Sequence, residues 1–348
     1  MYTRPGRATR ITLTTTGLNN LLALLLPTIY NIQRPTSTTY AQTQNKRLMP
    51  ERETPDKITV SQLRAKKAEG HKISMLTAYD YPTARLQDQA GIDIVFVGDS
   101  VGVNVLGYRS AQEVTMADML HHARAVRRAV ERAFFLVDMP FMSYQVSVET
   151  ALLNAGRLVQ EGGAEGVKLE GGKRILPQVE AIVQAGIPTM GHLGFTPQSK
   201  TRDYYLFSKE RGTVPKFHGK GPRGAQEILD ESRWLEDTGI FGLILEQVTE
   251  EAAQAVAERL AIPIIGIGSG RHCDGQVLIV NDLVGLNPDV PILAKAYASL
   301  HADLVDVFRA YRREVEQGIF PTAGNTLQMD ADKFQQLQKR LRKDEDEH

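Results

Sequence analysis

Five acidic residues stand at or near the ends of short apolar segments: Asp80, Asp99, Asp138, Glu170 and Glu246. In parallel α/β folds, the carboxyl ends of the strands meet at one edge, and that edge carries the active site. Several carboxylates from different strands suit a hard cation such as Mg²⁺, and Asp99 and Asp138 are the best candidates for its ligands. Asp is also a common helix N-cap, so each single Asp has a purely structural alternative.

Two of the acids are harder to explain as helix caps. In the segment VKLEGG, strand alternation puts Lys168 and Glu170 on one side and Val167 and Leu169 on the other. If the apolar pair faces surrounding helices, the charged pair lies inside, where charges must be paired or bound to a ligand. An internal ion pair without a chemical role is the alternative. Glu246 interrupts the apolar segment LILEQV in the same way, and a carboxylate there suits a general base.

Histidine and cysteine add one further candidate. His192 follows an apolar segment in GHLGFTPQS and is expected at the same edge as the acids, although a structural role is the alternative. His121 and His122 fall in a helical segment and are interpreted as surface or packing residues. Cys273 is the single cysteine, which excludes internal disulfides and Cys-rich zinc sites. We interpret it as incidental.

The elements that would position these residues are short apolar segments that alternate with helical patterns. Near-continuous apolar segments suit strands that are buried on both faces of a parallel sheet. The eight predicted strands are residues 72–80, 92–100, 134–140, 166–171, 187–193, 241–248, 262–270 and 276–282. Between them, one helix is expected to start at Thr115 with a capping box to Asp118, and another to run through Leu152, Ala155 and Leu158.

Eight strands separated by helices predict an α/β protein with a (β/α)8 TIM barrel. An open doubly wound sheet is the alternative, but the GxGxxG pattern of a dinucleotide site is absent from the first βα turn. The late segment GIGSG, residues 266–270, is either a weak phosphate signal or a tight turn at the barrel mouth.

Composition limits the partners that the chain can have. The 348 residues include 41 Lys+Arg and 41 Asp+Glu, so no net charge draws the protein to nucleic acid or to an anionic membrane. No apolar segment reaches the ~20 residues that a membrane-spanning helix needs.

Three regions are expected along the chain. Residues 1–56 lack acids before Glu51 and are interpreted as a disordered or targeting-like extension. Residues 57–322 form the catalytic barrel domain, and residues 323–348 form a polar C-terminal tail. The segment 200–221 is long and polar, and it lies where a lid or a cofactor contact is expected.

Taken together, several segments resemble the ketopantoate hydroxymethyltransferase family. They occur in the family's order over roughly residues 57–322, which makes the ordered set far more specific than any single motif. The segments are MLTAYDYPTA, FVGDSVGVNVLG, TMADMLHHARAVRR, LVDMPFMSY, GVKLEGG, GIPTMGHLGFTPQS, LILEQV and IPIIGIGSG. The segment 200–221 is longer than the usual family loop, so no folate-contacting residue is assigned.

The resemblance implies a barrel of the phosphoenolpyruvate mutase/isocitrate lyase kind. It implies transfer of a hydroxymethyl group from 5,10-methylenetetrahydrofolate to 3-methyl-2-oxobutanoate through a Mg²⁺-stabilised enolate, giving 2-dehydropantoate for pantothenate biosynthesis. It further implies a cytoplasmic homo-oligomer, typically a decamer, with no nucleic-acid or membrane partner.

The resemblance also assigns roles to individual residues. Glu246 corresponds to the proton acceptor, and the Mg²⁺ site corresponds to Asp99, Asp138 and Glu170. The substrate contacts correspond to Asp99, Ser100, Asp138, Lys168 and His192. Asp80 is then expected next to the metal ligands without binding the metal itself.

Two other functions stay open at this point. A related Mg²⁺-dependent lyase or aldolase could cleave a C–C bond of a 2-oxo acid with the same carboxylates. A catalytically inactive barrel could serve as a binding scaffold, although every matched acid is present.

Overall fold

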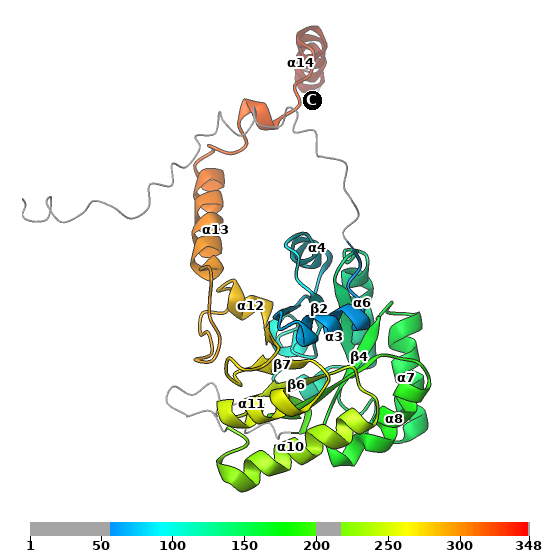
Figure 1. The fold of residues 1–348 in the computed structure, drawn as a ribbon. Coiled ribbons are helices and arrows are strands. Elements are labelled where there is room, and N and C mark those ends of the chain that lie inside the picture. The colour runs from blue at the N-terminus through cyan, green and yellow to red at the C-terminus, as the bar shows by residue number, and fades with distance from the viewer. Residues whose placement is uncertain (1–55, 200–216, 347–348) are drawn as a thin grey trace, which may run out of the picture. The chain divides into compact units, whose positions relative to one another are not determined.

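A closed barrel of eight parallel strands forms the centre of the computed structural model, which describes residues 56–199 and 217–346 (Figure 1). The strands are β1 (Ile73–Thr77), β2 (Ile94–Val97), β3 (Phe134–Asp138), β4 (Gly166–Glu170), β5 (Thr189–Gly194), β6 (Gly242–Glu246), β7 (Ile264–Ile267) and β8 (Gly275–Leu278). The predicted extension 1–56, apart from Asp56, and most of segment 200–221 lie outside the described residues.

The strands pair in chain order, and β8 closes the barrel by pairing with β1. The prediction of a (β/α)8 barrel is therefore confirmed, and the open doubly wound sheet is wrong. All eight predicted strands are present but shorter than predicted. The register places Asp138 beside Lys168 and Glu170 beside His192 at the carboxyl ends.

The helices cover the outer wall of the barrel where they follow the strands, as α6, α7, α8, α10 and α11 do in Figure 1. The described α-helices are α3 (Val60–Ala68), α4 (Tyr81–Gln89), α5 (Val101–Asn104), α6 (Met116–Arg127), α7 (Val148–Gln160), α8 (Leu176–Gln184), α10 (Gly221–Asp237), α11 (Glu250–Arg259), α12 (Val280–Leu283), α13 (Leu300–Glu316) and α14 (Ala331–Asp346). Short 3-10 turns are η1 (Ala111–Glu113), η2 (Lys173–Ile175), η3 (Pro197–Ser199) and η4 (Ala323–Asn325).

Local sequence explains where helix α6 begins and which residues helix α7 buries. The predicted capping box is confirmed, because Thr115 and Asp118 exchange hydrogen bonds at the start of α6. In α7, Ala155 and Leu158 are buried as predicted. Leu152 lies on the same predicted helix but is exposed. Ala151, one residue earlier on the helix, is buried instead.

The connection from β7 to β8 has no helix. Residues 268–274 run back along the barrel in an irregular path. Gly268 and Gly270 have φ angles of 61° and 83°, a left-handed conformation that glycine adopts without a steric cost. Between them, the Ser269 hydroxyl donates to the carbonyl oxygen of Leu245 at 2.7 Å. These φ angles and the Ser269 hydrogen bond favour the tight-turn interpretation of GIGSG.

Two apolar clusters separate the inside of the barrel from its outer wall. The inner cluster contains strand residues such as Phe96 and Leu136 together with Leu63 of α3. The outer cluster contains the alternate strand residues, such as Val167 and Leu169, packed against the surrounding helices. Because α3 contributes to the inner cluster and contacts β1, it closes the amino-terminal end of the barrel. Only the carboxyl end is left for chemistry.

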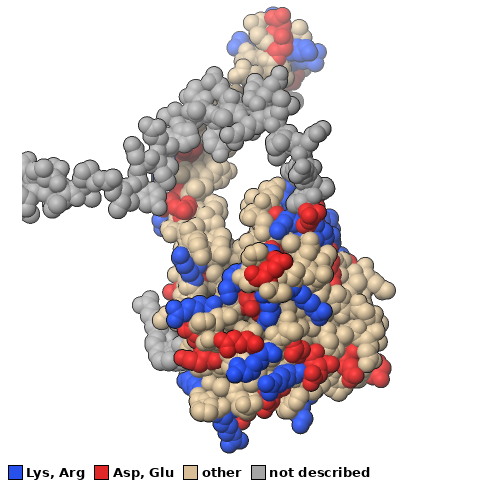
Figure 2. Space-filling model, viewed as in Figure 1, with Lys and Arg blue, Asp and Glu red and all other residues tan. Residues whose placement is uncertain are grey.

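The surface agrees with the balanced composition. Figure 2 shows Lys and Arg intermixed with Asp and Glu over the barrel. Across residues 56–199 and 217–346, no helix combines the length and apolar character needed to cross a bilayer. The polar region 323–348 contains helix α14.

Helix α7 offers a matched test of the packing. Leu158 is fully buried in the outer cluster, whereas Leu153 is 66% exposed. We expect Leu158→Ala to lower the free energy of unfolding by about 2–5 kcal/mol, because it leaves a cavity. Leu153→Ala should change it by about 0.5 kcal/mol or less. Urea unfolding followed by circular dichroism measures both, and equal effects would contradict this packing.

Candidate active site

A cluster of ionisable side chains fills the carboxyl end of the barrel interior. Its members are buried, each 5% exposed or less: Asp99, Asp138, Lys168, Glu170 and His192. Asp99 follows β2, and the others lie on β3, β4 and β5. Strand alternation turns them inward, since their neighbours on the strands pack in the outer cluster. The structure therefore brings together residues that the sequence places on four separate strands.

Lys168 lies at the centre of this cluster. Its Nζ atom is 2.8 Å from Asp138 Oδ1, 3.6 Å from Glu170 Oε1 and 3.3 Å from His192 Nδ1. The ammonium group also lies over the Phe96 ring, 5.5 Å from its centroid. One positive charge thus neutralises part of the negative charge of several carboxylates, which leaves the cluster with an excess of acid.

Burial controls the protonation of these groups. The pKa of Asp99 is raised to about 6, mainly because burial removes water from the carboxylate and secondly because Glu170 repels it. Burial likewise raises the pKa of Asp138 well above its ordinary value, and that of Glu170. Burial alone would lower the pKa of Lys168, but the carboxylates around it, Asp138 foremost, hold it above the ordinary value. Lys168 is therefore charged.

Glu246 lies at the edge of the cluster. It ends β6 on the same side as Ile244, which belongs to the inner cluster. Its Oε2 atom is 3.3 Å from Nε2 of His192, and its side chain is 18% exposed, against 3% for His192. Burial, and then the charge of Lys168, lowers the pKa of His192, so its imidazole is neutral near pH 7. Glu246 is thus the acid that a molecule entering the barrel mouth reaches first.

The other predicted residues lie outside this cluster or at its border. Ser100 is partly buried beside Asp99, and its hydroxyl is 2.8 Å from the hydroxyl of Tyr79. Asp80 is exposed and caps α4 by accepting from the backbone N–H of Thr83. The alternative that Asp80 is a helix cap is therefore confirmed. The expectation that Asp80 supports the metal ligands is wrong.

The remaining histidine and cysteine expectations are confirmed. His122 is buried, and its Nδ1 atom lies 2.6 Å from the carbonyl oxygen of Tyr79, a packing contact. Cys273 is buried, and burial raises its pKa to about 11. The thiol is protonated and unreactive near neutral pH.

The cluster is compatible with a divalent cation. In the part of the chain that the structure describes, no three acids, histidines or cysteines are close enough to hold an ion by themselves. Mg²⁺ is usually bound through one or two carboxylates and keeps several waters, so three direct protein ligands are not required. The buried Oε1 atom of Glu170 lies 3.6 Å from Lys168 Nζ and 3.4 Å from His192 Nδ1, distances that are longer than an ordinary hydrogen bond. Such an atom, next to acids with raised pKa values, suits a cation.

Sequence reasoning missed two buried polar residues that contact the acids. Gln198 in η3 donates to Asp99, and Tyr144 donates to Gln198. Neither residue type stands out in a search for charged side chains. Gln198 does lie in GHLGFTPQS, the segment that also contains His192, and its position there is the one signal in the sequence.

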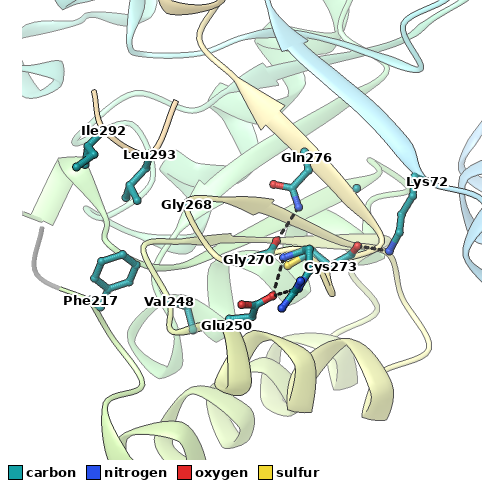
Figure 3. Close-up of a pocket in the computed structure, with 12 residues that line it drawn as sticks. Lys72, Phe217, Val248, Glu250, Gly268, Gly270, Cys273, Gln276, Ile292 and Leu293 are labelled. Carbon is teal, nitrogen blue, oxygen red and sulfur yellow. Dashed lines mark hydrogen bonds and ion pairs between the residues drawn. The ribbon is translucent and has the colours of Figure 1, made fainter. Parts of the chain in front are cut away.

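A separate cavity of about 720 Å³ lies on the outer side of the barrel near β7 and β8 (Figure 3). Gln276 and Cys273 line it, whereas Val277 points into the inner cluster. None of the clustered acids lines this cavity. The chemistry suggested by the acids therefore belongs to the barrel mouth and not to this cavity.

Fold and site together define a class: a (β/α)8-barrel enzyme with a buried acidic site at the carboxyl ends of its strands. Within that class, the chain belongs to the ketopantoate hydroxymethyltransferase family, whose model matches residues 57–323.

Curated relatives agree. A 3-methyl-2-oxobutanoate hydroxymethyltransferase from Thermoanaerobacter sp. is 48% identical over 267 residues, which cover 76% of this chain and 94% of the relative. A protein of the same name from Dehalococcoides mccartyi is 45% identical over 284 residues, covering 81% and 98%.

Among solved structures, a phosphonopyruvate hydrolase is similar with a TM-score of 0.50 and 12% identity, covering 81% of this chain and 95% of that one. At that identity the likeness concerns the fold alone. A 2,3-dimethylmalate lyase, described as a phosphoenolpyruvate mutase/isocitrate lyase superfamily member, gives a TM-score of 0.48 at 14% identity, covering 83% and 98%.

The raised pKa of Asp99 predicts a pH-dependent stability. Between the ordinary value of 3.8 and about 6, folded protein keeps a proton that the unfolded chain has lost. The free energy of unfolding therefore falls as pH rises through this window. Asp99→Asn cannot ionise, so without metal its stability relative to the parent should rise by up to about 3 kcal/mol between about pH 4 and pH 7.

Urea unfolding in EDTA at several pH values measures this difference. If the difference in free energy of unfolding between the two proteins does not change with pH, the raised pKa of Asp99 is contradicted.

Proposed function

We propose that this protein transfers a hydroxymethyl group from 5,10-methylenetetrahydrofolate to 3-methyl-2-oxobutanoate, giving 2-dehydropantoate and tetrahydrofolate in pantothenate biosynthesis. The names of relatives that are 44–48% identical support this activity. The observation that carries it is the position of Glu246 at the end of β6, 3.3 Å from His192, which in turn contacts Lys168 and Glu170.

The cluster suits the first substrate. A 2-oxo acid brings a carboxylate and a keto oxygen, and Lys168 offers the one ammonium group inside the described cluster. Asp99, Asp138 and Glu170 would hold Mg²⁺, whose positive charge favours loss of the proton next to the keto group. Ser100 borders the same site, and its hydroxyl can bind a substrate oxygen.

Glu246 acts as the base in this proposal. Its carboxylate takes the proton from the carbon next to the carbonyl, and the electron pair left behind forms the bond to the one-carbon unit of the folate. The one-carbon unit is bonded to two folate nitrogens, and both C–N bonds break, each with its electron pair going to nitrogen. The two nitrogens take up one proton from Glu246 and one from a water molecule, and the hydroxide left from that water supplies the hydroxyl group of the product. Neutral His192 lies 3.3 Å from Glu246 and can hold it in place.

The same proposal includes a cytoplasmic homo-oligomer, with a decamer as the expected size. Helix α13 has no buried residue, and its apolar side chains Val307, Phe308, Tyr311 and Val315 are 46–64% exposed. An apolar surface of this kind is typical of contacts between subunits. Sedimentation velocity tests this part, since a species of 38.6 kDa would be a monomer.

Glu246→Gln tests the assignment of the base. The amide cannot accept the proton, so hydrogen exchange at the carbon next to the carbonyl should fall by about 100-fold or more. The proton NMR signal of 3-methyl-2-oxobutanoate in D₂O with Mg²⁺ measures this exchange. Isothermal titration should show that the variant still binds the 2-oxo acid.

Glu250→Gln is the matched control, because Glu250 pairs with Arg271 on the surface outside the cluster. It should exchange at the parent rate. Exchange retained in Glu246→Gln would remove Glu246 from the role of base.

A further inference from the structure

Gln198 is the most extensively hydrogen-bonded polar residue beside the acid cluster. It lies in η3, the turn after β5, and is 1% exposed. Its side-chain Nε2 donates to Asp99 Oδ2 at 2.8 Å and to the Met139 carbonyl oxygen at 2.9 Å. Its backbone N–H donates to Glu170 Oε2 at 3.0 Å. One residue thus contacts two acids that come from different strands.

Neighbouring groups fix the orientation of the Gln198 amide. The Met139 carbonyl can only accept, so the NH₂ end must face it and Asp99. On the other side, Gln198 Oε1 accepts from the hydroxyl of Tyr144 at 2.7 Å. It also accepts from Gln145 Nε2 at 3.3 Å. Every hydrogen-bonding position of the side chain is therefore used, and the amide plane cannot turn.

Tyr144 extends the same network to Glu170. It is fully buried, and its hydroxyl accepts the backbone N–H of Glu170 at 3.1 Å. The turn that carries Gln198 is held from a further side by Gln112, whose Nε2 donates to the Gln198 carbonyl oxygen at 2.8 Å. The position of Gln198 is therefore set by residues that do not belong to the acid cluster.

We infer that Gln198 is a positioning residue, which orients the carboxylates of Asp99 and Glu170 for the cation. Gln198 engages only one oxygen of each carboxylate. At Glu170, the other oxygen is the buried Oε1 atom, which faces the centre of the cluster, 3.6 Å from Lys168 Nζ and 3.4 Å from His192 Nδ1. Holding one oxygen directs the other, which is how hydrogen-bonded neighbours of metal ligands act. This inference rests on the proposed function for its cation.

The side-chain type matters to this role. Methionine has a similar length but can neither donate to Asp99 nor accept from Tyr144. In Gln198→Met, the backbone N–H at position 198 can still donate its hydrogen bond to Glu170, so the turn can persist. The hydrogen bond from the side chain to Asp99 is lost. The carboxylate of Asp99 then loses its fixed orientation.

Binding of Mn²⁺ to the full-length protein, followed by electron paramagnetic resonance of the free ion, measures this role without any turnover. We expect Gln198→Met to raise the dissociation constant by about 10-fold or more. Gln87→Met is the matched control, because Gln87 is also buried and donates to the Thr77 carbonyl oxygen away from the acids. It should bind Mn²⁺ as the parent does, even if thermal stability falls equally in both variants.

Tyr144→Phe keeps the ring and removes only the hydroxyl that Gln198 and Glu170 contact. It provides the same test if Gln198→Met does not fold, with a rise in the dissociation constant as the expected result. Parent-like affinity in whichever of these variants folds would overturn the inference while leaving the proposed function in place. A parent protein that binds no Mn²⁺ would overturn the inference together with the metal part of the proposed function.

Discussion

The ion pair between Lys168 and Asp138, 2.8 Å long and almost fully buried, is the interaction on which the active-site end of this barrel depends. A buried ion pair gains little net stability, because both charges lose water. Here the pair is surrounded by two more acids, Asp99 and Glu170, whose pKa values are raised by burial, so their ionised forms need a further positive charge. Such an arrangement stabilises the protein poorly but is well suited to attract a cation and a substrate.

The barrel makes this burial possible because its two ends have different roles. At the amino-terminal end, Leu63 of α3 closes the interior with apolar contacts. The ion pair between Lys67 of α3 and Asp274, just before β8, holds this helix against the barrel. At the carboxyl end, apolar residues give way to the charged cluster. Stability and chemistry are therefore supplied by opposite ends of the same strands, which lets polar loops determine the reaction without weakening the core.

The sequence predicts much of this arrangement because strand alternation has a fixed period. The inward orientation of Lys168 and Glu170 follows from Val167 and Leu169 alone. Alternation cannot reveal contacts made outside the strands, such as those of Gln198 in η3 and of Asp80 at the start of α4. The spacing of Leu152, Ala155 and Leu158 predicts helix α7, but it does not show that Leu152 is exposed at the border of the buried face.

Turnover of the purified full-length protein tests the central claim, that this acid cluster performs metal-dependent hydroxymethyl transfer. The assay supplies 3-methyl-2-oxobutanoate and 5,10-methylenetetrahydrofolate and measures 2-dehydropantoate before chelation, after EDTA treatment, and after Mg²⁺ is restored. Our account predicts that product formation is lost on chelation and returns with Mg²⁺. Turnover that does not depend on a metal, or no turnover under any of these conditions, would contradict it.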